Sequence, residues 1–101
     1  MITAASIVEY TVKEGEGDEL NRCVQEYVVP AAREVAGYRG FLLFDRGENK
    51  RMAVLLFDSP QAVRAAQHQL TPVGEEHTYA LMSSPAIGSL GMVVVSDGLG
   101  G

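Results

Sequence analysis

Apolar residues recur at steps of three and four along residues 18–35. They are Leu20, Cys23, Val24, Tyr27, Ala31 and Val35. This spacing places the side chains on one stripe of a helix that buries one face. Asp18 is expected to be the N-cap, because a short carboxylate accepts a free backbone N–H. Pro30 removes one helix hydrogen bond, which predicts a kink near residues 26–30 or, alternatively, a helix end near Tyr27 followed by a second short helix.

Strand-forming residues lie on both sides of this helix. They predict a first strand over residues 2–13 and a hairpin made of residues 38–46 and 51–57. Gly37 follows the last periodic position, where glycine readily adopts the left-handed conformation that ends many helices. Gly40 lies inside the first hairpin strand and predicts a bulge or the close approach of another group.

The rest of the chain predicts a second helix and a last strand. Ser59 before Pro60 fits an N-cap followed by the first helical position, so a helix is expected over residues 60–70. Residues 71–84 predict a turn and a short helix, and residues 90–96 predict a strand. The order is that of an α+β, ferredoxin-like βαββαβ fold, which has a four-stranded antiparallel sheet with helices on one face.

Three predicted strands are apolar at successive positions instead of alternating. They contain FLLF (41–44), AVLLF (53–57) and MVVV (92–95). A sheet covered by helices on one face should alternate, so these runs predict that both faces are buried. Because soluble monomers rarely expose large apolar patches, we expect a homodimer with sheet packed on sheet. The alternative is that the third helical segment or a swapped tail covers part of that face.

Composition limits the kinds of partner. The 101 residues predict a single domain over residues 1–96 and a flexible C-terminal tail over residues 97–101. A net charge of -5 argues against nucleic acid, since binding phosphates requires Lys and Arg. No apolar run approaches the roughly 20 residues of a membrane span. The single cysteine and the lack of a signal-peptide pattern at the start predict a cytoplasmic protein.

No cofactor or metal is expected from the sequence. A glycine motif for phosphate binding is absent, which argues against a nucleotide cofactor. His68 and His77, the only histidines, lie nine residues apart, which fits no usual metal-ligand spacing.

Two short motifs carry a resemblance to a known family. Gly37-Tyr38-Arg39-Gly40 is similar to a Pro-Gly-Phe-x-Gly-like turn, and Phe57-Asp58-Ser59 is similar to a Trp-x-Ser-like strand end. With the βαββαβ order, residues 2–95 resemble the antibiotic biosynthesis monooxygenase-like group of the dimeric α+β barrel superfamily. The resemblance implies a homodimer whose two sheets form a barrel, and a pocket between sheet and helices in each subunit.

The resemblance also implies a choice of activities. Some relatives oxidise aromatic polyketides or quinols with O₂ and no bound cofactor, and others degrade haem with an Asn, Trp and His set. This chain has no tryptophan, and Phe57 stands where the family often has one. The haem-degrading role is therefore disfavoured.

Several side chains are candidates for such a site. His77 is proposed as a catalytic general base for a phenol, because imidazole titrates near neutral pH. Tyr10, Tyr27, His68 and Met82 are proposed to bind the substrate. The alternatives are that His68 lies on a solvated helix face, that His77 packs the short helix, and that the tyrosines pack in the core or an interface.

Two functions of different class follow. The first is a cofactor-independent monooxygenase that acts on a small aromatic or quinone-like compound. The second is a non-catalytic small-ligand-binding or stress-response module that uses the same pocket without turnover.

Overall fold

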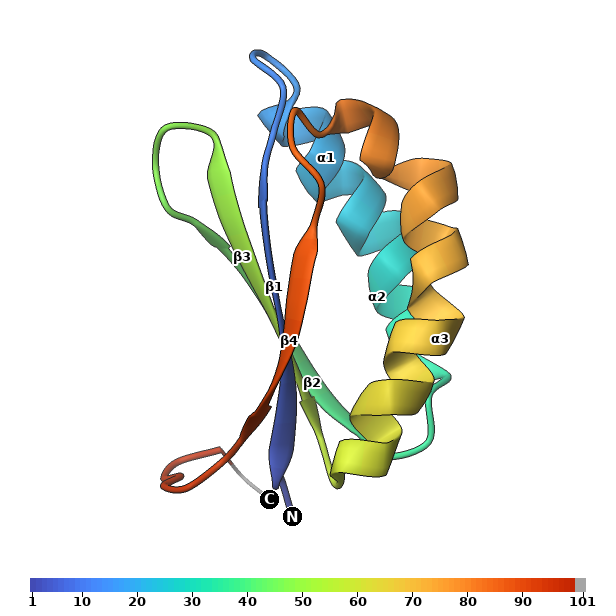
Figure 1. The fold of residues 1–101 in the computed structure, drawn as a ribbon, viewed down its shortest axis with the longest axis vertical. Coiled ribbons are helices and arrows are strands. Elements are labelled where there is room, and N and C mark those ends of the chain that lie inside the picture. Colours follow the sequence, from blue (N-terminus) through green and yellow to red (C-terminus); the bar gives the residue numbers. More distant parts are fainter. Residues whose placement is uncertain (100–101) are drawn as a thin grey trace.

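The computed structural model describes residues 1–99. Its elements, in order, are β1 (Ala4–Thr11), α1 (Gly17–Cys23), η1 (Val24–Val28), α2 (Val29–Arg33), β2 (Tyr38–Asp45), β3 (Lys50–Phe57), α3 (Pro60–His77), η2 (Tyr79–Leu81) and β4 (Ile87–Met92). The four strands form one sheet in the order β2-β3-β1-β4, and every neighbouring pair is antiparallel. Figure 1 shows all helices on one side of the twisted sheet, so the predicted ferredoxin-like arrangement is confirmed.

The first helical region contains one wide turn. In η1, a π-helix, the N–H of Val29 bonds to the C=O of Val24, one residue further back than in an α-helix. Pro30 follows directly in α2, and the backbone stays helical through Val24 and Val29. The irregularity predicted near Pro30 is therefore a π turn inside a continuous helix, and the alternative of a helix end near Tyr27 is wrong.

The start of this helix also differs from the prediction. Glu16 occupies the N-cap position and makes no side-chain cap hydrogen bond. The N-cap assignment of Asp18 was wrong, since the helix begins one residue before it, at Gly17. Asp18 lies in the first turn, where a carboxylate still interacts favourably with the helix dipole.

Gly37 and Gly40 determine the backbone path at the start of β2. Gly37 has a φ of +91°, and a Cβ there would lie 2.9 Å from the Cβ of Ala62, so conformation and space both require glycine. The register of β2 on β3 shifts between Tyr38 and Gly40, which confirms the predicted bulge.

The second helix is longer than predicted. Ser59 caps it as expected, because its Oγ accepts a hydrogen bond from the N–H of Ala62 at 3.1 Å. The predicted end at residue 70 is wrong, since α3 continues through Pro72 to His77. The end of α3 is secured by Thr78, whose N–H and hydroxyl both donate to the C=O of Gly74 at 2.8 Å. These bonds close the last turn despite the donor that is lost at Pro72.

The last strand is shifted towards the N-terminus. β4 ends at Met92, which pairs with Ala4 at the start of β1, so the prediction of a strand over residues 90–96 is wrong at both ends. Beyond this point Val93 still donates its N–H to Thr3, but β1 offers no further pairing and Val94 is 91% exposed. The single domain stays a prediction, and residues 100–101 of the predicted tail lie outside the described residues.

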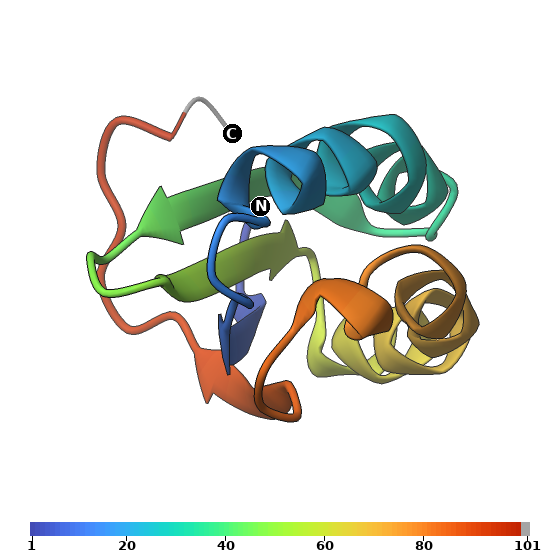
Figure 2. The ribbon, with the colours of Figure 1, turned by 90° about the horizontal axis from the view of Figure 1, so that it is seen from above.

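The core lies between the sheet and the helices. One cluster contains Phe57, Leu55, Val63 and Ala32, and a second contains Tyr10, Val12, Leu20 and Val24. Seen from above, α1–α2 and α3 lie side by side over the same sheet face (Figure 2). No helix in residues 1–99 is long and apolar enough to cross a membrane.

Candidate functional site

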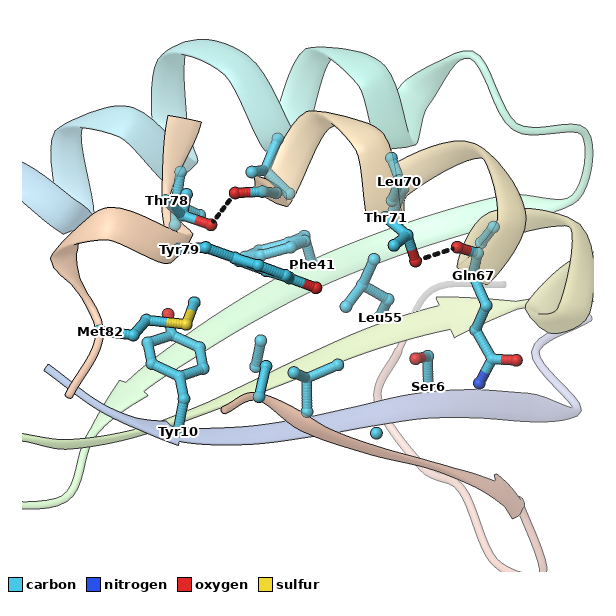
Figure 3. Close-up of a pocket in the computed structure, with 18 residues that line it drawn as sticks. Ser6, Tyr10, Phe41, Leu55, Gln67, Leu70, Thr71, Thr78, Tyr79 and Met82 are labelled. Atoms are coloured by element: carbon cyan, nitrogen blue, oxygen red, sulfur yellow. Dashed lines mark hydrogen bonds between the residues drawn. The ribbon is translucent and has the colours of Figure 1, made fainter. Parts of the chain in front are cut away.

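A cavity of about 340 Å³ lies between the sheet and the helical layer. η1 and α3 cover it, and the segment that holds η2 and Met82 closes one end (Figure 3). Much of its space comes from small residues that face inward, namely Ser6, Ala53, Ala66, Gly74, Ala86 and Gly88. Larger apolar side chains complete the wall, among them Val24, Val28, Phe41, Leu55 and Leu70. Such a space accepts a compact apolar ring.

Hydroxyl groups are the main polar feature of the wall. Thr71 donates to the C=O of Gln67 at 2.6 Å, and Thr78 donates to the C=O of Gly74 at 2.8 Å (Figure 3). Each threonine uses its hydrogen within the helix, so its oxygen can still accept a bond from a ligand.

Tyr10 supplies a buried phenol. Its side chain rises from β1 beside Met82 (Figure 3). Burial raises the pKa of Tyr10 to about 12, an effect that the positive charge of Arg51 partly opposes. The phenol is therefore protonated at neutral pH and can donate a hydrogen bond to a ligand oxygen.

Tyr79 places a second aromatic ring in the cavity. Its ring lies below α3 and points towards Phe41 and Leu55 (Figure 3). A Cβ on Gly74 would lie 3.0 Å from Cε1 of Tyr79, so the glycine allows the ring to pack closely against the helix. The ring can stack on an aromatic ligand.

The structure divides the predicted site residues into two groups. Tyr10 and Met82 line this cavity, whereas Tyr27, His68 and His77 do not. The rings of Tyr27 and His77 stack on each other, with centroids 3.8 Å apart and planes 5° from parallel. His77 also lies 3.6 Å from Glu76, and His68 is exposed. The catalytic role of His77 and the binding roles of the other four residues stay predictions.

Sequence reasoning missed Gln67, Thr71 and Thr78. For Thr71 and Thr78 the reason is the helix end predicted at residue 70, whereas Gln67 lies inside the predicted helix and was not singled out there. In the observed α3, positions 67, 70, 71 and 74, together with the C-cap Thr78, follow the three- and four-residue spacing of one helix face. Continuing the periodicity through Pro72 would have found them.

Potential metal ligands do not gather at one place in residues 1–99. In that part of the chain, no cluster of three or more His, Cys, Asp or Glu side chains is arranged to hold a metal ion.

Comparison with known proteins was informative only at the level of structure. No family model matches the chain, and no curated protein matches its sequence. A Nitrosomonas europaea protein provisionally named an antibiotic biosynthesis monooxygenase is 13% identical, with a TM-score of 0.77 over 95% of this chain and 94% of that chain. SnoaB, a cofactor-independent oxygenase from Streptomyces nogalater, is 16% identical, with a TM-score of 0.76 over 93% of this chain and 95% of that chain.

A third solved structure contains a ligand. It is a monooxygenase from the ActVA-Orf6 gene of Streptomyces coelicolor in complex with nanaomycin D, 16% identical, with a TM-score of 0.74 over 95% of this chain and 91% of that chain. These likenesses confirm the fold that the resemblance implied. The chain has the α+β fold of the antibiotic biosynthesis monooxygenase-like proteins.

Proposed function

We propose that the protein binds a small aromatic or quinone-like compound in this cavity and oxidises it with O₂ without a bound cofactor. The observation that carries the proposal is the cavity itself: an apolar space of about 340 Å³ with two aromatic hydroxyls, Tyr10 and Tyr79, in its wall. Two proteins of the same fold support the reaction class, since one is named a cofactor-independent oxygenase and the other a monooxygenase.

The lining residues have separate roles in this proposal. Tyr79 and Phe41 contact the flat faces of the ring, Met82 adapts to its edge, and Tyr10 donates a hydrogen bond to a ring oxygen. A phenolate is the electron-rich form that reacts with O₂, and a hydrogen bond from a protonated Tyr10 stabilises that oxyanion.

The proposed reaction needs no electron source besides the substrate. A hydroquinone and O₂ give a hydroxyquinone and water: one oxygen atom forms the new C–O bond and the other leaves as water. The substrate gives up four electrons in total, which reduce O₂ completely. His77 is the proposed acceptor of the first phenol proton. His77 directly precedes Thr78, which lines the cavity. To reach a bound substrate, its imidazole must move away from the ring of Tyr27, on which it stacks.

The test is O₂ consumption with a panel of naphthohydroquinones, corrected for spontaneous oxidation. We expect Tyr10→Phe to lower kcat/KM by roughly tenfold or more, as expected for one lost hydrogen bond to a charged group. Tyr38→Phe is the matched control, because it removes the same hydroxyl from a tyrosine that does not line this cavity. Full activity in His77→Ala would exclude His77 as the base, and no turnover above the spontaneous rate would exclude the oxygenase.

A second candidate function is ligand binding without turnover. It is favoured by the lining of the cavity, in which none of the described residues carries a carboxylate, an imidazole or an amine. Quinone binding without O₂ consumption, weakened by Tyr10→Phe, is the expected result for such a binding or stress-response module.

We also propose that the protein is a cytoplasmic homodimer. The sheet face opposite the helices carries Leu42 at 50% exposure, Phe44 at 46% and Ile87 at 70%, and soluble proteins usually cover such a surface. Native mass spectrometry tests this proposal: a mass of two chains is expected, and a monomer at micromolar concentration would contradict it.

A further inference from the structure

A second cavity lies next to the first on the helix side of the sheet. Its volume is about 670 Å³, and it is bounded by β2, β3 and the helical region from α1 to α2. Val24 and Phe41 line both cavities and form the wall between them. Nothing in the proposed oxidation uses this second space, so its lining requires a separate explanation.

The lining contains two arginines. Arg51 extends from β3 with only 8% of its side chain exposed, and Arg33 comes from the end of α2. Burying a guanidinium is expensive unless hydrogen bonds and an opposite charge compensate for the lost water. A buried arginine in a cavity wall is therefore a strong indication of how that cavity is used.

The partners of Arg51 compensate for its charge only partly. Its Nε donates to Asn21 Oδ1 at 3.4 Å, and its Nη1 lies 3.4 Å from the C=O of Lys50 and 3.1 Å from Asp45 Oδ1. Asp45 is the carboxylate of the site, and its side chain is 68% exposed, so water weakens this ion pair. No described residue accepts a hydrogen bond from Nη2, so its two N–H donors remain available to a ligand.

A glycine allows the guanidinium of Arg51 to pack closely against the start of α1. A Cβ on Gly17 would lie 2.8 Å from Nη2, so any other residue at the start of α1 would displace the guanidinium. Apolar side chains form the remaining wall, mainly Val29, Phe41 and Leu43. The site thus combines two cationic groups with an apolar surface, in a chain whose net charge is -5.

We propose that this second cavity binds a small organic acid. Its carboxylate bonds to Arg51 and Arg33, and its apolar body packs on Val29, Phe41 and Leu43. A guanidinium matches a carboxylate in shape and charge, and two guanidiniums outnumber the single Asp45 in the wall. The amide of Gln25 adds a further N–H donor at the same wall.

The experiment compares benzoate with benzamide, a neutral compound of nearly the same shape. Binding is measured by calorimetry, and ¹⁵N chemical-shift mapping identifies the cavity. We expect benzoate to bind with shifts at Asn21, Gln25 and Leu43, and benzamide to bind at least tenfold more weakly. Because one tenfold step is about 1.4 kcal/mol, this difference lies within the range of a single charged hydrogen bond.

Matched variants assign the binding to the arginines. Arg33→Gln and Arg51→Gln are each expected to weaken benzoate binding roughly tenfold or more, whereas Arg64→Gln, an exposed arginine on α3 that lines neither cavity, leaves it unchanged. Arg33 is also exposed, so Arg33→Gln remains informative if Arg51→Gln fails to fold.

Three results would overturn the proposal. They are equal affinity for benzoate and benzamide, no benzoate binding at 10 mM, or chemical shifts confined to Gly74 and Tyr79 of the first cavity. None of these results depends on O₂ consumption, so the proposal can fail while the proposed oxidation stands, and the reverse also holds.

Discussion

The two faces of the sheet use similar apolar strands in different ways. On the face that the helices cover, Phe57 and Val12 are fully buried and two cavities remain between the layers. On the opposite face, Leu42 and Phe44 are about half exposed, and the described chain places no helix over them (Figure 1). The apolar residues of these strands thus fall into two sets: one forms the core, and the other lies on the face that the helices leave open.

The pairing register explains how one strand serves both purposes. Val54 lies between Ile7 and Leu42 on the open face, and its neighbour Leu55 points into the core. Since successive residues of a strand face opposite ways, an uninterrupted apolar run supplies both faces. The following predictions test this difference between the faces, in order of decreasing effect.

Phe57→Ala should have the largest effect. Phe57 has no exposed surface and lies edge-on to Tyr38, with ring centroids 6.1 Å apart. We expect the free energy of unfolding to fall by about 3–5 kcal/mol, because the substitution leaves a cavity in the core. Urea denaturation measures the change, and a loss below about 1 kcal/mol would mean that the core under α3 repacks freely.

Leu42→Glu tests the open face. In the proposed sheet-on-sheet homodimer, a carboxylate at this position would be buried without a partner, so we expect the dimer dissociation constant to rise at least roughly a hundredfold. Gln61→Glu adds the same charge on α3 and should leave the dimer intact. Analytical ultracentrifugation distinguishes the two variants, and a dimer that tolerates Leu42→Glu would place the interface elsewhere.

High pH should destabilise the helix-covered face through Tyr10. The pKa of this phenol is raised from 10.0 to about 12 in the folded chain, so the folded protein holds the proton more tightly than the unfolded one. Its contribution is complete below pH 10 and is lost as the pH rises to about 12. We expect a decrease of about 2 kcal/mol in the free energy of unfolding over that interval.

Tyr10→Phe provides the control for this pH dependence. The variant cannot ionise at this position, so its stability should fall less between pH 10 and 12 than that of the unmodified chain. Parallel curves for the two proteins would show that the ionisation of Tyr10 does not matter for folding.

Ser59→Ala should have the smallest effect. The substitution removes the N-cap bond to Ala62 at the start of α3, and a loss of about 1 kcal/mol is expected. Ser96→Ala, an exposed serine beyond β4, serves as the control and should be neutral. A neutral Ser59→Ala would mean that Pro60 alone fixes the start of the helix.

Much of the fold could be predicted because its signals are local. The helix stripe from Leu20 to Val35, the Ser59-Pro60 start and the glycines at 37 and 40 each depend on neighbouring residues. The full length of α3 would have required following the periodicity through Pro72, and the extent of β4 has no local signal. α3 ends where Thr78 bonds back to the C=O of Gly74, and the end of β4 depends on where its partner β1 begins.

The candidate site was less accessible to sequence reasoning. Tyr10 and Met82 were proposed as binding residues and do line the first cavity. Arg51 was not singled out, because its burial results from the layer of α1 above it and not from its neighbours in sequence. The only sequence signal for this burial is that Arg51 lies two residues before Ala53, and therefore on the same face of β3.

The π turn in η1 sets the rotational phase of the first helical region. Leu20, Val24, Val28 and Ala32 are spaced by four, and in a pure α-helix each such step overshoots a full turn by about 40°. The wider turn at Val24–Val28 takes back part of this drift, so Leu20 and Ala32 are both fully buried against the sheet. Deleting one residue from this turn should therefore leave a regular α-helix with nearly the same rotational phase, about 20° between Leu20 and Ala32, so that Ala32 still packs against the sheet.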